Sequence, residues 1–216
     1  MNSAVEEHHI TVPRTARYHT LGDPSTARAL WIVLHGYGHL ARYFLREFEG
    51  LEDELLIVAP EGLSRYYADR EHTRVGAAWM TREDREYEVA DQLTYLDRLA
   101  SVVAARCAPK TPLHVLGFSQ GVATACRWTA LGATPVHRAV LWGGSLPPDI
   151  PDAAMQERWR DITIDLVHGE KDPVVPLEIL GQSEAKLRSA GVRYAIHRFD
   201  GAHALDKLLL QRLIKA

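Results

Sequence analysis

The sequence contains only two cysteines, Cys107 and Cys126, among its 216 residues. Neither belongs to a Cys-x-x-Cys pair or to a cysteine–histidine spacing typical of zinc sites, so no metal is expected. Cys107 lies near the end of one predicted helix and Cys126 inside another, which favours two free thiols in a reducing compartment. The neighbouring His8 and His9 are expected to be disordered, which is favoured over a metal-binding histidine pair.

Long apolar runs and an excess of one charge are also missing. No stretch of 18 apolar residues is present, so no transmembrane helix is expected, and the polar segment Met1–Ile10 lacks the apolar core of a signal peptide. The formal net charge is -3, with acids and bases interspersed, so a basic face for nucleic acid is not expected. These absences predict a cytoplasmic protein with no nucleic-acid partner and no stable membrane association. The sequence leaves a homodimer open.

The composition that remains is typical of a globular domain. Hydrophobic residues make up 46% of the chain and charged residues 25%, and the length is ordinary for a single core. Neither an internal repeat nor a linker interrupts the chain, so residues 1–216 are predicted to form one domain. Strand-like and helix-like segments alternate, which predicts an α/β fold with a mostly parallel central sheet and helices on both faces.

The pattern predicts about six parallel core strands, each a short apolar run: Ala29–Leu34, Leu55–Ala59, Leu113–Leu116, Ala139–Trp142, Ile164–Val167 and Tyr194–Phe199. Two earlier segments are predicted as an antiparallel edge, Ile10–Val12 and Arg17–Leu21. The expected helices are Ala41–Phe48, Glu86–Ala105, Gln120–Leu131, Leu177–Ser189 and Leu205–Lys215. The long segment Leu63–Trp79 has no clear period and is predicted as a loop. No long helical insertion follows Ala139–Gly144, so no cap domain is expected.

One motif joins a predicted strand directly to a predicted helix. It reads Gly117-Phe-Ser119-Gln-Gly121, the G-x-S-x-G pattern of a nucleophile elbow, in which a strained turn exposes a serine above the sheet. The helix that follows points its positive end at charge developing near the serine. The pattern is also compatible with an N-capping serine in a glycine-rich turn. A dinucleotide-binding loop has a different glycine spacing and opens its domain.

A serine nucleophile needs a histidine base and an acid that orients it. Asp172 follows the strand Ile164–Val167, in a loop stiffened by Pro173 and Pro176, and His203 follows the last strand. The chain order of serine, acid and histidine is therefore that of α/β-hydrolases, and Ser119, Asp172 and His203 are predicted to be catalytic. Three other acids fit less well: Asp165 lies within a strand, Glu170 comes one residue too early for the usual spacing, and Asp200 is close enough to His203 to be a turn former.

The oxyanion of an acyl-transfer intermediate requires two backbone N–H donors. One is expected from Gln120, which follows the serine, and the other from Tyr37 in the loop His35-Gly36-Tyr37-Gly38 after the strand Ala29–Leu34. A plain turn is the alternative interpretation of that loop. Four apolar residues in loops near the predicted site are candidates for substrate binding, although Trp142 is almost as well explained as a core residue: Trp79, Met80, Trp142 and Leu146.

With these motifs the chain resembles the phospholipase/carboxylesterase family of α/β-hydrolases, which includes small bacterial carboxylesterases and acyl-protein thioesterases. The matching landmarks are Leu34-His-Gly36, Pro60-Glu-Gly62, Trp79, Leu116-Gly-Phe-Ser-Gln-Gly121, Gly143-Gly-Ser-Leu-Pro147, His168-Gly-Glu-Lys-Asp172 and His203. The resemblance implies the α/β-hydrolase fold and hydrolysis of carboxylic esters, or in some members acyl thioesters, without a metal or organic cofactor. The chain differs from thioesterase-like members at Tyr37-Gly-His39, often Leu-Gly-Asp there, and at Trp79-Met-Thr81, usually Trp-Phe-Asp.

The favoured hypothesis is a serine carboxylesterase that hydrolyses short- to medium-chain small-molecule esters through an acyl-enzyme on Ser119. An acyl thioesterase or lysophospholipase would use the same three residues. A dienelactone hydrolase fits less well, because that group typically has a cysteine nucleophile. The alternative from another class is a non-catalytic binding module on a hydrolase fold, and the presence of all three predicted catalytic residues counts against it.

Overall fold

The computed structural model describes residues 5–215, so the outermost residues of the predicted domain 1–216 lie outside the described range. Seven strands form one sheet in the order β1-β3-β2-β6-β7-β8-β9. Their bounds are β1 Tyr18–Leu21, β2 Ala29–Leu34, β3 Leu55–Pro60, β6 Leu113–Phe118, β7 Arg138–Trp142, β8 Thr163–Gly169 and β9 Tyr194–Phe199. The six predicted core strands are all present, and successive neighbours among them pair in parallel.

The edge strand β1 pairs antiparallel with β3, as expected for the segment Arg17–Leu21. The central strands are apolar at almost every position because both faces of the sheet are covered. Within β2, for example, Leu30 and Ile32 face one hydrophobic cluster, whereas Trp31 and Val33 face the other. This alternation follows from the two-residue period of a strand.

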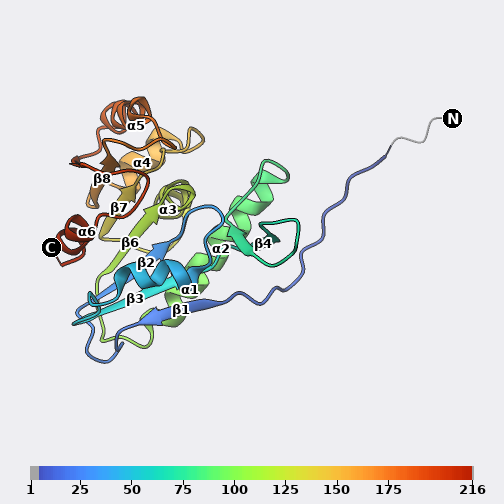
Figure 1. Ribbon diagram of the computed structural model, residues 1–216, viewed down its shortest axis with the longest axis horizontal. Coiled ribbons are helices and arrows are strands. Elements are labelled where there is room, and N and C mark those ends of the chain that lie inside the picture. Colours follow the sequence, from blue (N-terminus) through green and yellow to red (C-terminus); the bar gives the residue numbers. More distant parts are fainter. Residues whose placement is uncertain (1–4, 216) are drawn as a thin grey trace.

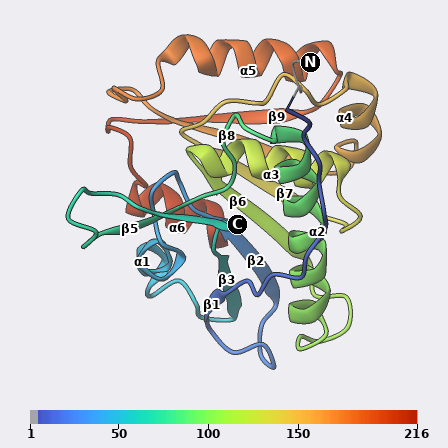
Figure 2. The ribbon, with the colours of Figure 1, turned by 90° about the vertical axis from the view of Figure 1, so that its right-hand side faces the viewer.

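Helices cover both faces, which confirms the predicted layering (Figures 1 and 2). One face is covered by α2 Arg85–Ala104, α3 Gln120–Leu131, α4 Asp152–Arg158 and α5 Leu177–Ser189. The other is covered by α1 Ala41–Phe44, the 3-10 helix η1 Leu45–Phe48 and α6 Lys207–Lys215. The predicted helices Gln120–Leu131 and Leu177–Ser189 have the observed bounds, whereas the predicted helix Ala41–Phe48 divides into α1 and η1.

Two predictions about local structure are wrong, and one short helix was not predicted. Ile10–Val12 is not a strand: Ile10 is 85% exposed and the chain before β1 runs as an extended arm (Figure 1). The predicted loop Leu63–Trp79 contains an antiparallel hairpin of β4 Ser64–Tyr67 and β5 Val75–Ala78. The short helix α4 was not predicted, because seven residues carry little periodic signal; its Met155 is fully buried.

Both cysteines are free thiols, as the sequence predicted, and Cys126 is fully buried within α3. The segment between β7 and β8 contains α4 as its one helix among the described residues, so no cap domain covers the sheet. Over residues 5–215, no helix combines the length and the hydrophobicity that crossing a membrane requires.

Candidate active site

Ser119 lies at the sharp turn between β6 and α3. Its φ of 53° and ψ of -117° place an L-residue in a strained backbone conformation. The two glycines of the motif make the turn possible: a Cβ at Gly117 would collide with the carbonyl of Gly121, and one at Gly121 would collide with the carbonyl of Leu34. The elbow therefore depends on close backbone contacts that side chains would block.

The structure brings the three predicted catalytic side chains together from three different loops. Ser119 Oγ lies 2.9 Å from His203 Nε2, and His203 Nδ1 lies 2.7 Å from Asp172 Oδ2. The Asp172 side chain is 1% exposed and that of His203 is 16% exposed. The spacing is right for a proton to pass from the hydroxyl to the imidazole, with the carboxylate holding the opposite ring nitrogen.

Asp172 is held in an ionised state by the loop around it. Its Oδ1 accepts hydrogen bonds from the N–H groups of Val174 and Val175, at 2.8 and 2.9 Å. Burial raises the pKa of Asp172, but the hydrogen bonds from Val175, His203 and Val174 outweigh that effect, so its pKa lies below the ordinary value. Asp172 is therefore a carboxylate at neutral pH.

The loops that carry Asp172 and His203 are packed directly against each other. Lys171 N–H donates to the carbonyl of Gly201 at 2.9 Å, and a Cβ at Gly169 would lie 2.5 Å from that same oxygen. The rival acids lie elsewhere. Asp165 pairs with Arg138 and His197 at 2.7 Å each, and Asp200 pairs with Lys171. Among the acids weighed from the sequence, Asp172 is the one that contacts His203.

The predicted oxyanion loop runs beside the serine. A Cβ at Gly36 would lie 3.2 Å from the Cβ of Ser119, so the loop backbone contacts the elbow. Within residues 5–215, the N–H groups of Tyr37 and Gln120 have no hydrogen-bond acceptor, whereas the next N–H, that of Gly38, donates to the Ala77 carbonyl at 2.9 Å. Two backbone donors without an acceptor, one in the elbow and one in the adjoining loop, fit the requirement of an oxyanion.

A buried histidine holds the start of this loop. His35 has no exposed surface; its Nδ1 lies 2.7 Å from the Gly36 carbonyl and its Nε2 accepts from the Gly62 N–H at 3.0 Å. These partners define the neutral tautomer with the proton on Nδ1. Burial is the largest effect on the ring and lowers the pKa of His35 to about 4. His35 thus joins the oxyanion loop to the segment after β3.

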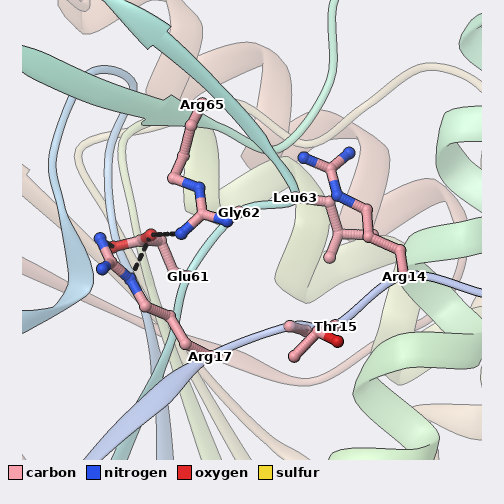
Figure 3. A pocket seen from close by; sticks show the side chains of 8 residues that line it. Arg14, Thr15, Arg17, Glu61, Gly62, Leu63 and Arg65 are labelled. Atoms are coloured by element: carbon pink, nitrogen blue, oxygen red, sulfur yellow. Dashed lines mark hydrogen bonds and ion pairs between the residues drawn. The ribbon is translucent and has the colours of Figure 1, made fainter.

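That segment is fixed by the buried carboxylate of Glu61, which is 2% exposed (Figure 3). Arg17 binds it through two nitrogens, at 2.7 and 3.1 Å, and Arg65 approaches to 3.5 Å. The Ala41 N–H also donates to it at 3.3 Å. Two cations and a backbone donor compensate the buried charge and hold the Glu61–Gly62 corner in position for His35.

The side chain of Gln120 has a second task that the motif did not indicate. Its Oε1 accepts from the Trp79 N–H at 3.0 Å, and its Nε2 donates to the Met80 carbonyl at 2.9 Å. Gln92 of α2, which is 2% exposed, donates to the Trp79 carbonyl. Gln92 lies on the same buried side of α2 as Leu96 and Leu99, and a polar residue in that position was the available sequence signal for this contact. These amides fix the segment after β5 to the elbow.

Three of the four predicted substrate-binding residues lie inside the core. The rings of Trp79 and Trp142 are each 1% exposed, and Leu146 is 8% exposed. Trp79 Nε1 donates to the His35 carbonyl at 2.8 Å, and Trp142 Nε1 donates to the Ala204 carbonyl at 3.0 Å. Both tryptophans therefore anchor loops of the site from within the core, through their indole N–H groups. Met80 is partly exposed, and its sulfur lies 3.2 Å from Arg127 Nη1.

The residue before the serine, Phe118, lies between two imidazoles. Its ring centroid is 5.0 Å from that of His203 and 6.0 Å from that of His39, which is nearly parallel to it at 17°. Partial burial, followed by the proximity of His203, lowers the pKa of His39. His39 is therefore neutral at pH 7 and adds no positive charge beside His203.

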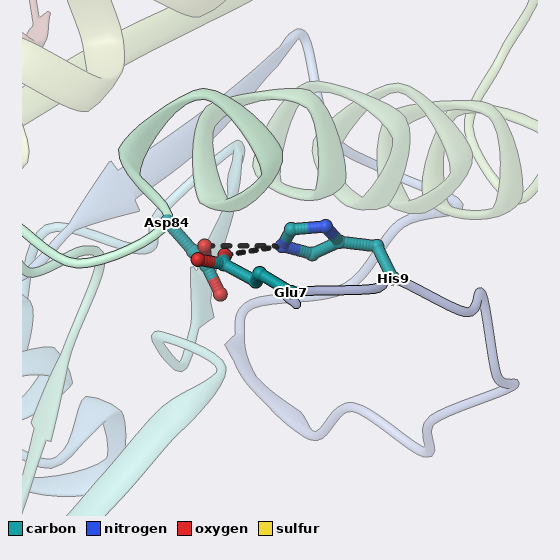
Figure 4. Close-up of side chains that lie close together, drawn as sticks. All are labelled: Glu7, His9 and Asp84. Atoms are coloured by element: carbon teal, nitrogen blue, oxygen red, sulfur yellow. Dashed lines mark hydrogen bonds and ion pairs between the residues drawn. The ribbon is translucent and has the colours of Figure 1, made fainter. Parts of the chain in front are cut away.

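A second cluster of polar side chains joins the N-terminal arm to α2 (Figure 4). The ligand atoms of Glu7, His9 and Asp84 lie within 4.8 Å of one another, and all three residues are exposed. His9 Nε2 lies 3.3 Å from Glu7 and 3.1 Å from Asp84, and its ring stacks on Tyr87 at 4.1 Å. The hydrogen bond to Asp84 and the stacking on Tyr87 explain the arrangement, so we assign no metal to it.

A mostly parallel sheet with helices on both faces and a strained serine between a strand and a helix defines an α/β-hydrolase fold. A family model described as Phospholipase/Carboxylesterase matches residues 22–216. The chain belongs to the phospholipase/carboxylesterase family, and the protein is accordingly a hydrolase of the carboxylesterase type. Comparison with curated protein sequences gives no match.

Solved structures of esterases and thioesterases have the same fold. Zea mays acyl-protein thioesterase 2 superposes with a TM-score of 0.74 at 20% identity, covering 93% of this chain and 97% of that one. Esterase PE8 has a TM-score of 0.69 at 19% identity, covering 94% and 99%. The Bacillus cereus carboxylesterase has a TM-score of 0.67 at 14% identity, covering 93% and 92%. At these identities the likeness concerns the fold alone.

Proposed function

We propose that this protein is a serine carboxylesterase that hydrolyses short- to medium-chain carboxylic esters through an acyl-enzyme on Ser119. The observation that carries the proposal is the continuous hydrogen-bonded chain from Ser119 Oγ through His203 to the buried carboxylate of Asp172, at 2.9 and 2.7 Å. A serine hydroxyl becomes a useful nucleophile only with such a base and such an orienting acid.

In the first half of the reaction, Ser119 Oγ attacks the carbonyl carbon of the ester and its proton passes to His203 Nε2. The carbonyl oxygen becomes an oxyanion, which the N–H groups of Tyr37 and Gln120 stabilise by hydrogen bonding. The intermediate collapses with cleavage of the bond to the alcohol oxygen. His203 donates its proton to the leaving alcohol, and the acyl group remains esterified to Ser119.

In the second half, water attacks the acyl-enzyme while His203 Nε2 takes a proton from it. Collapse of the second tetrahedral intermediate returns that proton to Ser119 Oγ and releases the carboxylic acid. Asp172 stays ionised throughout, because its hydrogen bonds lower its pKa, and its charge stabilises the imidazolium in both halves.

The test is hydrolysis of p-nitrophenyl acetate, butyrate and octanoate by the wild type and by Ser119→Ala. We expect turnover by the wild type and a loss of about a million-fold in kcat for the variant, as for other triad nucleophiles. Ser101→Ala, at an exposed position of α2, is the matched control and should retain full activity. The dependence on chain length then measures the length of acyl group that the site accepts.

An acyl thioesterase is the second candidate, supported by the fold likeness to the Zea mays acyl-protein thioesterase 2. Parallel assays on ethyl butyrate and S-ethyl thiobutyrate separate the two. Labelling of Ser119 by a fluorophosphonate, with turnover of the thioester alone, would support the thioesterase. Absence of both labelling and turnover would overturn both proposals and favour a non-catalytic binding module.

A further inference from the structure

An exposed aromatic side chain stands next to the serine elbow. Gly36 contacts Ser119 so closely that a Cβ on it would lie 3.2 Å from the serine Cβ. Tyr37 is the next residue, one Cα step of about 3.8 Å further along the chain. Its side chain is 60% exposed, so the ring is accessible from solvent.

The ring of Tyr37 has an aromatic partner from the hairpin β4–β5. Tyr66 of β4 stacks on it with ring centroids 5.3 Å apart and an interplanar angle of 28°. The hairpin is bound to the oxyanion loop by the hydrogen bond from Gly38 N–H to the Ala77 carbonyl at 2.9 Å. Tyr37 and Tyr66 together are named the tyrosine platform below.

Two glycines allow the hairpin to approach this closely. A Cβ at Gly76 would lie 3.0 Å from the Cα of Gly38 and 3.2 Å from the Tyr66 ring, and a Cβ at Gly38 would lie 3.3 Å from the Tyr66 hydroxyl. Gly38 also has a φ of 77°, a conformation that favours glycine. The loop and the hairpin are thus packed backbone to backbone, which holds the platform at a fixed position beside the elbow.

We propose that the tyrosine platform binds an aromatic ring of the ester substrate and makes the enzyme selective for esters that carry one. The inference rests on the proposed esterase function. Offset or tilted aromatic pairs gain about 0.5–1.5 kcal/mol beyond area burial, because ring edges and faces carry opposite partial charges. A saturated ring of similar size buries comparable area but lacks the aromatic interaction. The preference for the aromatic over the saturated ester therefore measures the contribution of the platform.

The opposite side of the site offers aliphatic rather than aromatic surface. Val174, whose N–H binds Asp172, is 63% exposed, and Leu177 is 46% exposed. The sheet order β2-β6-β7-β8 places the loop with Tyr37 on one side of the elbow after β6, and the segment with Val174 and Leu177 on the other. The two halves of an ester, acyl and alcohol, extend in different directions from the carbonyl carbon, and the proposal assigns one of them to the platform.

The test is the ratio of kcat/KM for phenyl acetate over cyclohexyl acetate, measured for the wild type and for Tyr37→Leu and Tyr66→Leu. Each substitution should lower this ratio by about 2- to 10-fold. The substitution at residue 37 retains the backbone N–H, and comparing the ratio between variants removes the intrinsic reactivity of phenyl esters. A second pair, methyl benzoate and methyl cyclohexanecarboxylate, shows whether the acyl half or the alcohol half meets the platform.

Two variants separate ring stacking from a structural effect. Tyr37→Phe retains the ring and should retain the wild-type ratio. Tyr67→Leu alters the neighbouring tyrosine of the same hairpin, which is 60% exposed and stacks on His72 instead, and should also leave the ratio unchanged. Ratios for Tyr37→Leu and Tyr66→Leu equal to that of the wild type, in both substrate pairs, would overturn the platform while leaving the esterase intact. Absence of turnover by the wild type on all four esters, without labelling of Ser119, would instead overturn the proposed function.

Discussion

Lowering the pH from 7 to 5 should destabilise the folded protein through His35. The ring is completely buried, and its Nε2 accepts the Gly62 N–H at 3.0 Å. A proton on Nε2 would face that N–H donor and would place an uncompensated charge in the core. Burial is the largest cause, and it lowers the pKa of His35 to about 4 in the folded protein.

The magnitude follows from the two pKa values. In the unfolded chain His35 has an ordinary pKa of 6.5, so between pH 6.5 and 4 the unfolded state binds the proton and the folded state does not. The free energy of unfolding therefore falls as the pH is lowered through this window. The loss is about 2 kcal/mol at pH 5 and about 3 kcal/mol below pH 4, a large share of the stability of a typical domain.

The assay is urea denaturation followed by tryptophan fluorescence at pH 7, 6 and 5, for the wild type and for His35→Gln. The glutamine amide retains an acceptor for the Gly62 N–H but does not titrate, so we expect the wild type to lose about 2 kcal/mol more than the variant between pH 7 and 5. His114, whose pKa burial also lowers to about 4, is present in both proteins and cancels. His8→Gln, at an exposed position, serves as the control. Equal losses in wild type and His35→Gln would refute the reasoning.

Three further predictions concern the same loops. Ser119→Gly should be more stable than Ser119→Ala by about 1–3 kcal/mol in denaturant titrations, because glycine tolerates the φ of 53° that alanine does not; equal stability would contradict strain at the elbow. Gly121→Ala should abolish activity and lower the thermal midpoint by several degrees, because its Cβ would collide with the Leu34 carbonyl. A fully active variant would show that the backbone of the elbow can shift to accommodate the methyl group. Trp79→Phe removes the 2.8 Å hydrogen bond to the His35 carbonyl and should cost about 1–3 kcal/mol of stability; kcat should fall with little change in KM, and a change in KM alone would argue against a role in holding the oxyanion loop.

The elements that could be predicted from the sequence are those with a strong local signal. The continuous apolar runs of the central strands identify them as buried on both faces, and the strand–glycine–serine–helix order predicts the elbow at Ser119. Gly132 directly follows α3, and Gly191 lies one residue beyond the C-cap of α5, which is why the predicted C-terminal bounds of both helices match the structure.

The hairpin β4–β5 could not be predicted because its stability comes from outside its own sequence. Gly76, Ala77 and Ala78 are small residues with little strand propensity, and they pair with β4 where the hairpin lies against the oxyanion loop. The opposite error occurred at Ile10 and Val12, where strand-like alternation is present but the side chains are 85% and 65% exposed and the segment pairs with no strand among the described residues.

The tryptophans show the same division. From the sequence, an indole in a loop is equally compatible with a pocket wall and with the core. Tertiary packing alone places the rings of Trp79 and Trp142 in the core, where each donates to a loop carbonyl. The sequence by itself determined the fold, the family and the order of Ser119, Asp172 and His203, because these depend on hydrophobic period and local motifs. Only the tertiary structure decided the contacts of His35, Gln120 and the tyrosine platform, because each joins segments that lie far apart in the chain and interact only once the sheet has formed.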